Sequence, residues 1–423
     1  MKQMHIEITE NRYRIDLDRL MVLAHRLNNS KRNFLFVSKT LGKHIEVEPN
    51  MCRVMGYILA SLKYGRRASL SHWLDYLQNP SGYRLTIGQT LQTPYQPMER
   101  VAVLGFAETA TGLGMGVASA IEGAYYLQTT RESILDIPNL IQFEEEHSHA
   151  TQHQCFPSEP SELEQVDRLI LVDDELTTGQ SLLNLIEELI KITPIRRFTM
   201  LTILDWRTPE HEARVQAMCD TYGLEIEIEA VIKGVARSED QTVYQGQTPT
   251  WLTSTIAPEH CLVLNQIPRQ SRQTKEGIRS YYRENGRFGL TQETLVGMER
   301  YFHEAAEVIV EKLKTLEWTG KFYGHLLVVG HGEDIYYPSR VAAAIATRFD
   351  GLVDFKTTTR SPIYCQSEEG YPIQQAHAFK DESGVTYYVY NKDRMDETYD
   401  AVIFITETGL SVQFAEKQLT VQL

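Results

Sequence analysis

The sequence predicts an α/β protein with an open, mostly parallel sheet flanked by helices, followed by a second, smaller α/β domain. Short apolar runs such as residues 169–172 (LILV) are typical of buried parallel strands. They alternate with stretches that carry apolar residues at helical spacing, as residues 182–190 do. The 423 residues are enough for two or three domains, and a composition of 42% apolar and 23% charged residues is typical of a globular protein.

The expected elements follow one another in a regular order. A helix is expected at 49–64, and strands are expected at 34–37, 101–104, 197–204 and 224–235. The last of these strands is expected to be antiparallel, because acidic and apolar residues alternate in it. Residues 268–291 are polar and basic with little apolar periodicity, so we expect a linker there between domains at 1–267 and 292–423.

Two carboxylates and a run of small polar residues separate the strand at 169–172 from the helix after it. The start of a helix presents unpaired N–H groups and the positive end of its dipole, which can hold a phosphate. A glycine allows backbone conformations that side chains forbid. The carboxylates suit two vicinal ribose hydroxyls or a Mg²⁺ ion. The pattern indicates a phosphorylated-sugar site, with an ordinary strand–turn–helix as the alternative; its residues are Asp173, Asp174, Thr177, Thr178, Gly179, Gln180 and Ser181.

A second loop of small residues follows the strand expected at 101–104. Alanine and glycine let a backbone approach a ligand closely, and they also let a helix pack closely on a sheet, so both interpretations stay open. The loop contains Glu108, Thr109, Ala110, Thr111 and Gly112.

Residues 144–153 gather glutamates and histidines. His149 and His153 are four residues apart, so a helix would place them on one face, and a metal site is one interpretation. A solvated polar loop is the other interpretation that the residues themselves support.

Residues 169–181 resemble the phosphoribosyl pyrophosphate (PRPP) motif of type I phosphoribosyltransferases. In that motif four apolar, two acidic and two variable residues precede T-T-G-x-[ST]. The resemblance implies that Asp173 and Asp174 are catalytic and bind the ribose hydroxyls and Mg²⁺, directly or through water or substrate. It implies that residues 177–181 bind the 5′-phosphate. Glu175 departs from the motif, which usually has an apolar residue there.

The same resemblance gives roles to the other loops. It implies that Glu108 is catalytic and lies in a pyrophosphate loop with Thr109, Ala110, Thr111 and Gly112. Either Lys39 or Lys43, from the basic turn after residues 34–37, would bind pyrophosphate as well. Residues 144–153 would form a mobile lid that excludes water, with Glu146, His147 and His149 close to the reactants.

Three blocks recur in the same order in the two halves of the chain. VLGFAET (103–109) is similar to VVGHGED (328–334), TTRES (129–133) to TTRSP (358–362), and VDRLILVDDELTTG (166–179) to YDAVIFITETG (399–409). We interpret the second domain as a divergent copy of the first, without the acidic pair; chance similarity of two α/β sheets is the alternative. Its loops predict a second ligand site, or a structural remnant of one, at strand ends, formed by His331, Glu333, Thr359, Arg360 and Ser361.

Four blocks together extend the resemblance over most of the chain: SKTLGKH (38–44), GFAETATGLG (105–114), FEEEHSHAT (143–151) and VDDELTTGQS (172–181). They resemble the phosphoribosyltransferases of bacterial tellurite-resistance and stress gene clusters, which carry a C-terminal domain named for its T-R-S-P motif, here residues 359–362. This implies Mg-dependent phosphoribosyl transfer from PRPP to an unidentified, base-like acceptor, in the synthesis or salvage of a nucleotide-like metabolite. A noncatalytic PRPP or nucleotide sensor is the alternative.

Charge and composition narrow the expected partners and location. A net charge of −14 makes nonspecific binding to nucleic acid unfavourable. No apolar segment approaches the length of a signal-peptide core or a membrane span, and five scattered cysteines are typical of reduced thiols. We therefore expect a cytoplasmic protein with small-molecule substrates and no membrane partner, and we leave a homodimer open.

Overall fold

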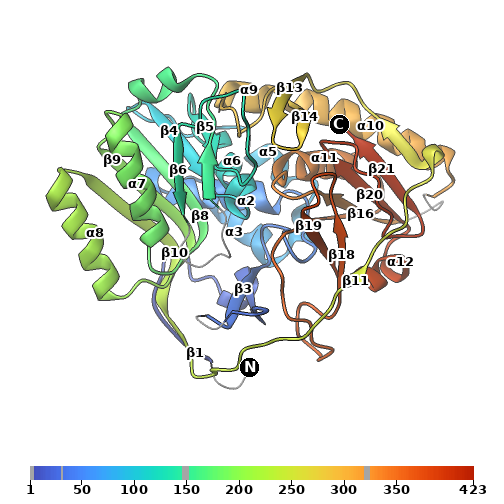
Figure 1. Cartoon of the computed structure of the whole chain (residues 1–423), viewed down its shortest axis with the longest axis horizontal. Coiled ribbons are helices and arrows are strands. Elements are labelled where there is room, and N and C mark those ends of the chain that lie inside the picture. Colours follow the sequence, from blue (N-terminus) through green and yellow to red (C-terminus); the bar gives the residue numbers. More distant parts are fainter. Residues whose placement is uncertain (1–3, 30–31, 145–151, 319–323) are drawn as a thin grey trace.

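The computed structural model describes residues 4–29, 32–144, 152–318 and 324–423, and two helix-covered sheets lie beside each other in it (Figure 1). This division into two α/β halves matches the expected fold class. In this part of the chain, no helix is both long enough and apolar enough to cross a membrane.

The first sheet has, within the described ranges, five inner parallel strands and two antiparallel edge strands. Four of the five inner strands are buried on both faces, as continuous apolar runs predict, whereas the strand at residues 225–238 is only partly buried. The strand expected at 224–235 is antiparallel to one neighbour only and runs parallel to the other. In spatial order the strands are β1 (Met4–Asn11), β10 (Glu225–Ser238), β9 (Arg197–Asp205), β8 (Arg168–Leu176), β4 (Val101–Gly105), β5 (Tyr125–Gln128) and β15 (Leu290–Thr291).

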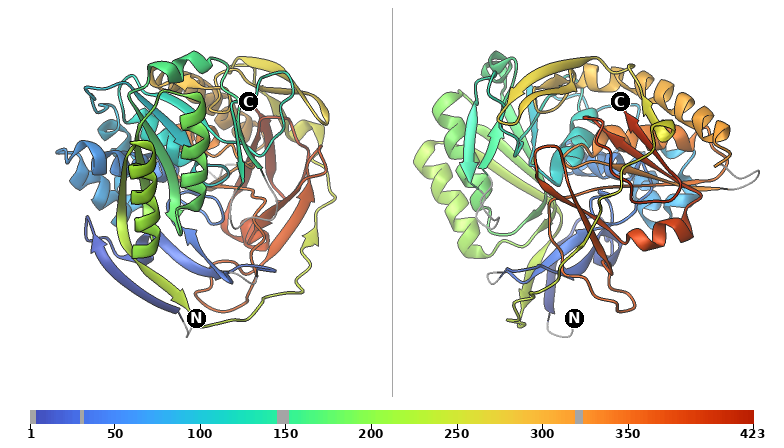
Figure 2. Two further views of the ribbon diagram at one scale, coloured as in Figure 1. Left: turned by 60° about the vertical axis from the view of Figure 1, so that its left-hand side comes forward. Right: turned by 45° about the vertical axis from the view of Figure 1, so that its right-hand side comes forward.

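Helices cover both faces of this sheet (Figure 2). On one face α2 (Met51–Tyr64) packs against α6 (Ala110–Ser119), and on the other lie α7 (Gln180–Ile192) and α8 (Pro209–Tyr222). The approach of α2 to α6 is so close that a Cβ on Gly56 would lie 2.3 Å from the carbonyl carbon of Gly116. Shorter helices are α1 (Leu17–Leu20), α3 (Leu70–Gln78), α4 (Pro80–Tyr83), α5 (Ile87–Thr90) and the 3₁₀ helix η1 (Pro160–Gln165).

The second sheet is parallel throughout its described strands, which are, in spatial order, β12 (Cys261–Val263), β21 (Gln418–Gln422), β20 (Ala401–Thr406), β16 (His325–Gly330) and β17 (Leu352–Thr357). One face packs on α10 (Glu299–Thr315) and α11 (Tyr336–Ala346). The other packs on a small sheet of β11 (Thr250–Trp251), β18 (Ala376–Lys380) and β19 (Thr386–Tyr390), through side chains such as Leu327 and Phe379. The remaining short helices are α9 (Gln292–Gly297), α12 (Met395–Thr398), η2 (Pro258–His260) and η3 (Lys392–Arg394).

The two halves share one strand order. The strands β9-β8-β4-β5 of the first sheet correspond to β21-β20-β16-β17 of the second. α6 follows β4 as α11 follows β16. In the first half a hairpin of β6 (Ile141–Glu144) and β7 (Gln152–Cys155) lies between β5 and β8, and in the second half the hairpin β18–β19 lies between β17 and β20. This agreement in order, direction and connection supports the interpretation as a divergent copy. α7 has no counterpart, because residues 407–417 link β20 to β21 without a helix.

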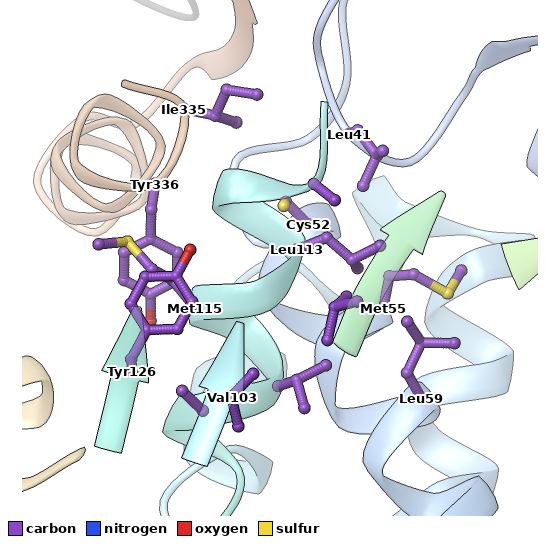
Figure 3. Close-up of a cluster of buried hydrophobic side chains, with 14 of the residues drawn as sticks. Leu41, Cys52, Met55, Leu59, Val103, Leu113, Met115, Tyr126, Ile335 and Tyr336 are labelled. Carbon is purple, nitrogen blue, oxygen red and sulfur yellow. The ribbon is translucent and has the colours of Figure 1, made fainter. Parts of the chain in front are cut away.

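The halves meet along α6 and α11. Figure 3 shows side chains of α6, such as Met115 and Leu113, between Met55 of α2 and the residues Ile335 and Tyr336 at the start of α11. A Cβ on Gly112 would lie 2.8 Å from Ile335 Cγ2. The small residues of α6 therefore allow close packing on two sides. Close packing, one of the two interpretations that the sequence leaves open, explains why residue 112 is a glycine.

The segment expected to be a linker, residues 268–291, is structured. It forms a hairpin of β13 (Arg269–Thr274) and β14 (Gly277–Tyr282) and then supplies the edge strand β15 of the first sheet. β11 and β12, which precede it, already belong to sheets of the C-terminal half. The hairpin lacks apolar periodicity because its polar groups are bonded: Arg269, for example, donates to the carbonyl oxygens of Glu407 and Leu423. The chain therefore crosses between the halves more than once.

One further hairpin, β2 (Met21–His25) with β3 (Phe34–Ser38), lies beside the carboxyl ends of the first sheet's strands (Figure 1). An isolated bridge pairs Arg26 with Ile363, so this hairpin also contacts the C-terminal half.

Candidate active site

β8 carries the acidic pair at its carboxyl end. The strand continues to Leu176, beyond the expected end at Val172, because residues 173–176 still pair with β9. Asp173 and Asp174 are partly exposed, and the N–H of Asp174 donates to Asp173 Oδ1 at 3.0 Å. Burial raises the pKa of Asp174, an effect that the Lys43 cation opposes and the neighbouring Glu175 carboxylate reinforces. Additional positive charge at this strand end would therefore be favourable.

The turn between β8 and α7 has the geometry of an anion site. Gly179, immediately before α7, adopts φ = +78°, in the left-handed region. The N–H of Gln180 donates to Thr178 Oγ1 at 3.1 Å, and Thr177, Thr178 and Ser181 are partly exposed. These hydroxyls, the N–H groups of the first turn and the dipole of a 13-residue helix can together bind a phosphate.

Glu175, the departure from the PRPP motif, has a partner. Arg32 Nη1 donates to Glu175 Oε2 at 3.1 Å, and Nη2 contacts the other carboxylate oxygen. The same guanidinium lies over the ring of Phe34, 4.5 Å from its centroid. The ion pair balances a carboxylate that would otherwise add a third negative charge beside the acidic pair.

Lys43 lies between the acidic pair and the expected pyrophosphate loop. Its Nζ donates to Thr109 Oγ1 at 2.6 Å and lies 3.7 Å from Glu108 Oε2. Lys39, the alternative from the same turn, is directed elsewhere, because its Nζ donates to the carbonyl oxygen of Asp18 at 2.6 Å. Of the two expected lysines, Lys43 is therefore the one that the fold brings to the other predicted residues.

Glu108 is buried, with 3% of its surface exposed. Its carboxylate lies 3.9 Å from Arg131 Nη1 and accepts from the N–H of Arg360 at 3.1 Å and from Thr359 Oγ1 at 3.3 Å. Burial raises its pKa, but Lys43, Arg131 and Arg360 outweigh burial and hold the pKa of Glu108 below its ordinary value. Glu108 is therefore enclosed and ionised. These contacts favour a positioning role for its carboxylate, and the expected catalytic role stays a prediction.

Glu333 repeats this arrangement from the other half. It follows β16 as Glu108 follows β4. Its Oε2 accepts from Thr130 Oγ1 at 2.7 Å, and its Oε1 accepts from the N–H of Arg131 at 2.9 Å. Thr130 and Arg131 occupy in the TTRES block the places that Thr359 and Arg360 occupy in TTRSP. We call these two arrangements the clasps: in each, a glutamate of one half holds the Thr-Arg turn of the other.

The rest of the expected pyrophosphate loop lies in α6. Ala110, Thr111 and Gly112 form its first turn and are buried, and Thr111 Oγ1 donates to the carbonyl oxygen of Glu333 at 2.8 Å. Only Glu108 and Thr109 remain in the turn itself, and Thr109 is the partly exposed one of the two.

The predicted C-terminal residues lie together at the carboxyl ends of β16 and β17. His331 Nδ1 lies 2.8 Å from Thr358 Oγ1, and Thr359 Oγ1 accepts from the N–H of Ser361 at 3.1 Å. The guanidinium of Arg360 donates to the Tyr387 hydroxyl, from Nε at 3.0 Å and from Nη2 at 2.8 Å. Burial, reinforced by Arg360, lowers the pKa of His331 to about 3, so its ring is neutral.

The position that corresponds to the acidic pair is filled from within the chain. Thr406 and Glu407 replace the two aspartates, and Glu407 accepts from Arg287 Nη1 at 2.9 Å, Tyr282 N–H at 2.7 Å and Asn285 Nδ2 at 3.1 Å. These donors belong to residues 282–287, in the segment expected to be a linker. The cavity beside Glu407 measures about 30 Å³, about a tenth of the smallest typical small-molecule site. The second half therefore offers no room for PRPP there.

The expected lid falls largely outside the described residues, which exclude Glu146, His147 and His149. On either side of that gap the chain forms the hairpin β6–β7. His153 is buried, stacks on Phe143 with 5.1 Å between ring centroids, and lies 3.0 Å from Thr129 Oγ1 through Nδ1. Across the described ranges, no three His, Cys, Asp or Glu side chains are grouped so as to hold a metal ion by themselves.

Arg131 contacts Glu108 and Arg32 contacts Glu175, and the sequence motifs predict neither arginine. Arg131 lies three residues after the end of β5, and a basic residue just beyond the carboxyl end of a parallel strand is a signal that could have identified it. Arg32 lies in a polar loop and carries no local signal, because its importance comes from Glu175, 143 residues away in the sequence.

Two family profiles match the chain. One, described as a phosphoribosyl transferase, covers residues 20–235, just over half of the chain. The other, described as the TRSP domain C-terminal to that transferase, covers residues 284–422. No curated protein sequence is significantly similar to the chain.

Several solved structures are similar to part of the chain. Adenine phosphoribosyltransferase from Giardia lamblia, solved with 9-deazaadenine, is 18% identical, with 38% of this chain and 84% of that chain covered and a TM-score of 0.26. The enzyme from Trypanosoma brucei, in complex with AMP, pyrophosphate and ribose-5-phosphate, is 14% identical over 36% of this chain, with a TM-score of 0.24, and only 65% of its own length is covered. Orotate phosphoribosyltransferase from Mycobacterium tuberculosis H37Rv is 16% identical, with coverages of 42% and 87% and a TM-score of 0.20.

The match over residues 20–235 includes the PRPP motif and the strand, turn and helix that β8 and α7 form there. The chain therefore belongs to the phosphoribosyl transferase family of enzymes and carries a TRSP domain after the transferase domain.

Proposed function

We propose that this protein transfers the phosphoribosyl group of PRPP to a small, base-like acceptor and releases pyrophosphate, in the synthesis or salvage of a nucleotide-like metabolite. The observation that carries the proposal is the β8–α7 turn, where a carboxylate pair and an anion-binding helix start follow one another within residues 173–181. The turn offers carboxylates for the hydroxyls of a phosphorylated ribose and a helix start for its 5′-phosphate.

The residues around the turn divide the binding of PRPP among them. Asp173 and Asp174 accept hydrogen bonds from the two ribose hydroxyls, and the first turn of α7 with its hydroxyl side chains binds the 5′-phosphate. Lys43, between Thr109 and the acidic pair, faces the pyrophosphate group. Arg131, whose backbone and side chain are both held by clasp glutamates, adds a second positive charge on that side.

The acidic pair fits a magnesium ion. Adjacent, partly exposed carboxylates are the hard oxygen ligands that Mg²⁺ prefers, and the raised pKa of Asp174 marks a place short of positive charge. Asp173 and Asp174 would hold the ion directly, or through water or the substrate. When bound, it would neutralise charge on the pyrophosphate group.

In the chemical step the protein mainly positions the reactants and stabilises charge. The transition state implied by the resemblance is a ribosyl oxocarbenium ion with departing pyrophosphate. Lys43 and Arg131 stabilise the negative charge that develops on pyrophosphate, and the acidic pair fixes the ribose ring so that the acceptor approaches its anomeric carbon.

The test is calorimetric binding of PRPP with Mg²⁺ to the wild-type chain and to the double variant Asp173→Asn, Asp174→Asn. Each lost charge-assisted hydrogen bond should cost about 1.5–3 kcal/mol, so affinity should fall by about a hundredfold or more. Asp220→Asn, on the exposed side of α8, removes a carboxylate elsewhere and should bind PRPP as the wild type does.

Unchanged PRPP affinity in a folded double variant would remove the acidic pair from the site. Pyrophosphate release, assayed with candidate acceptors, then separates a transferase from a protein that binds PRPP only as a sensor.

A further inference from the structure

A cavity of about 620 Å³ lies between the two halves of the chain, outside the residues assigned to PRPP. It is bounded by the hairpin β2–β3, by the segment that follows β10, and by residues 364–371 of the C-terminal half. Its volume falls in the range of small-molecule sites, roughly 300–1,000 Å³.

Aromatic rings form much of the cavity wall. His25 stacks on Tyr244 with 4.0 Å between ring centroids and an interplanar angle of 20°. Tyr371 is also nearly parallel to His25, at 5.9 Å, and Tyr364 lies 4.9 Å from Tyr244. Rings held in this way offer flat apolar surfaces on which a planar molecule can stack.

The polar part of the wall is acidic. Asp240, Glu368 and Glu369 line the cavity, and among its described lining residues none is a lysine or arginine. Asp240 accepts hydrogen bonds from the N–H of Thr242 at 2.9 Å and from the Tyr244 hydroxyl at 2.7 Å, and these bonds lower the pKa of Asp240 to about 2. Ionised carboxylates repel anions and accept from N–H donors.

The cavity lies at the same edge of the first sheet as the acidic pair. Its residue Asp240 follows β10, and the acidic pair ends β8, which runs in the same direction. A short series of contacts joins the two places: Phe34 of the wall lies under the guanidinium of Arg32, and Arg32 pairs with Glu175, the residue after Asp174. Three side chains, Phe34, Arg32 and Glu175, therefore connect the cavity wall with the strand end that carries the acidic pair.

The C-terminal half closes the other side of the cavity. The N–H of Tyr364 donates to the carbonyl oxygen of His25 at 2.9 Å, and the N–H of His25 donates to the Tyr371 hydroxyl at 2.9 Å. Residues from both halves of the chain are thus needed to form the wall.

We propose that this cavity binds the acceptor, and that the acceptor is a planar nitrogen heterocycle with amino or ring N–H donors, neutral or positively charged. The assignment as acceptor rests on the proposed transferase function. The ligand class follows from the wall, which stacks planar rings and disfavours carboxylated ones. The TRSP domain therefore contributes directly to acceptor recognition through residues 364–371.

Calorimetry can test this with adenine and cytosine as neutral amino heterocycles and orotate as an anionic one, each titrated with and without PRPP and Mg²⁺. We expect adenine or cytosine to bind at one site per chain, and orotate to bind at least tenfold more weakly. Tyr364→Ala should weaken heterocycle binding at least tenfold, and Glu368→Gln, at an exposed position, severalfold. Tyr222→Ala, an exposed tyrosine of α8, is the matched control and should bind as the wild type does.

Failure of both heterocycles to bind under either condition would overturn the assignment. Wild-type heterocycle affinity in Tyr364→Ala, or in Glu368→Gln if Tyr364→Ala does not fold, would do the same. Tighter binding of orotate would contradict the ligand class. PRPP titrated into the same samples separates the two proposals: no PRPP binding to the wild type would overturn the proposed function, whereas PRPP binding together with unaffected cavity variants would overturn only the cavity assignment.

Discussion

Asp334, in the loop after β16, has one carboxylate oxygen buried without a hydrogen-bond partner. Burial, and then the charge of Glu407, raise the pKa of Asp334 to about 7, although Arg287 opposes the rise. An unfolded aspartate has a pKa of about 3.9. Between about pH 4 and 7 the folded chain therefore keeps a proton that the unfolded chain has lost, and its stability falls as the pH rises through this window.

We expect Asp334→Asn to remove this dependence. Relative to the wild type, the unfolding free energy of the variant should rise by up to about 1.4 kcal/mol per pH unit between about pH 5 and 7 and then level off. Chemical denaturation at several pH values measures the difference, with Asp220→Asn on exposed α8 as the control. If the Asp334→Asn and wild-type curves run parallel, Asp334 is ionised throughout and its pKa is not raised.

At the scale of single residues, the sequence predicts chemistry that is local and misses chemistry that is not. The acidic pair and the phosphate turn are contiguous, so their pattern can be read directly. Glu108 is enclosed by Thr359 and Arg360, which come 251 and 252 residues later in the sequence. No local pattern reports that enclosure, so the sequence alone does not show that the other half of the chain holds the Glu108 carboxylate.

At the scale of elements, the crossing of α2 and α6 sets how close the helix layer comes to the first sheet. A Cβ on Gly56 would meet only backbone atoms of α6, at 2.3 to 2.6 Å. Backbone cannot move aside as a flexible side chain can, so the helices would have to separate. Gly297, at the end of α9, has open space around its Cα instead.

These two glycines make a matched pair for a stability measurement. Gly56→Ala should lower the unfolding free energy by about 1–3 kcal/mol or more, because it overpacks the crossing. Gly297→Ala should leave it unchanged or raise it by up to about 1 kcal/mol, because alanine favours a helix. Thermal denaturation of both variants is the measurement. A neutral Gly56→Ala would show that the crossing of α2 and α6 does not require a glycine at this position of α2.

The sequence predicts some elements better than others, again because it reports local patterns and not contacts between distant segments. Buried parallel strands are apolar throughout, so β4, β8 and β9 are visible in the sequence. The hairpin β13–β14 has polar side chains such as Arg269, which donates to carbonyl oxygens far along the chain, and a polar segment of this kind resembles a linker in the sequence. The order of the strands, and the parallel pairing of β10 with β9, depend on which strands meet in space. No pattern within a single strand reports this.

At the scale of the whole molecule, the two halves contact each other through equivalent loops. Glu108 holds the Thr359–Arg360 turn and Glu333 holds the Thr130–Arg131 turn, so each contact has a counterpart with the halves exchanged. This is the pattern of an interface between two identical subunits related by a two-fold axis. In this chain the second half, with its own site filled by Arg287, takes the place of such a partner and supports the loops of the first.

This arrangement predicts that the clasps serve pyrophosphate binding as well as stability. Thr359→Val and Thr130→Val each leave a buried glutamate without one donor, which should cost about 1.5–3 kcal/mol of unfolding free energy. Because the same glutamates hold Lys43 and Arg131 in place, both variants should also weaken the calorimetric affinity for pyrophosphate with Mg²⁺ severalfold.

The control is Tyr399→Phe, which removes a hydroxyl that donates to Asp354 Oδ2 at 3.0 Å in the C-terminal half, away from the clasps. It should lower stability to a similar extent and leave pyrophosphate affinity at the wild-type value. If the two threonine variants behave like Tyr399→Phe, losing stability but binding pyrophosphate normally, then the second half only packs against the first. A loss of affinity confined to the threonine variants would instead mean that the C-terminal half positions the pyrophosphate-binding residues, as an internal substitute for a second subunit.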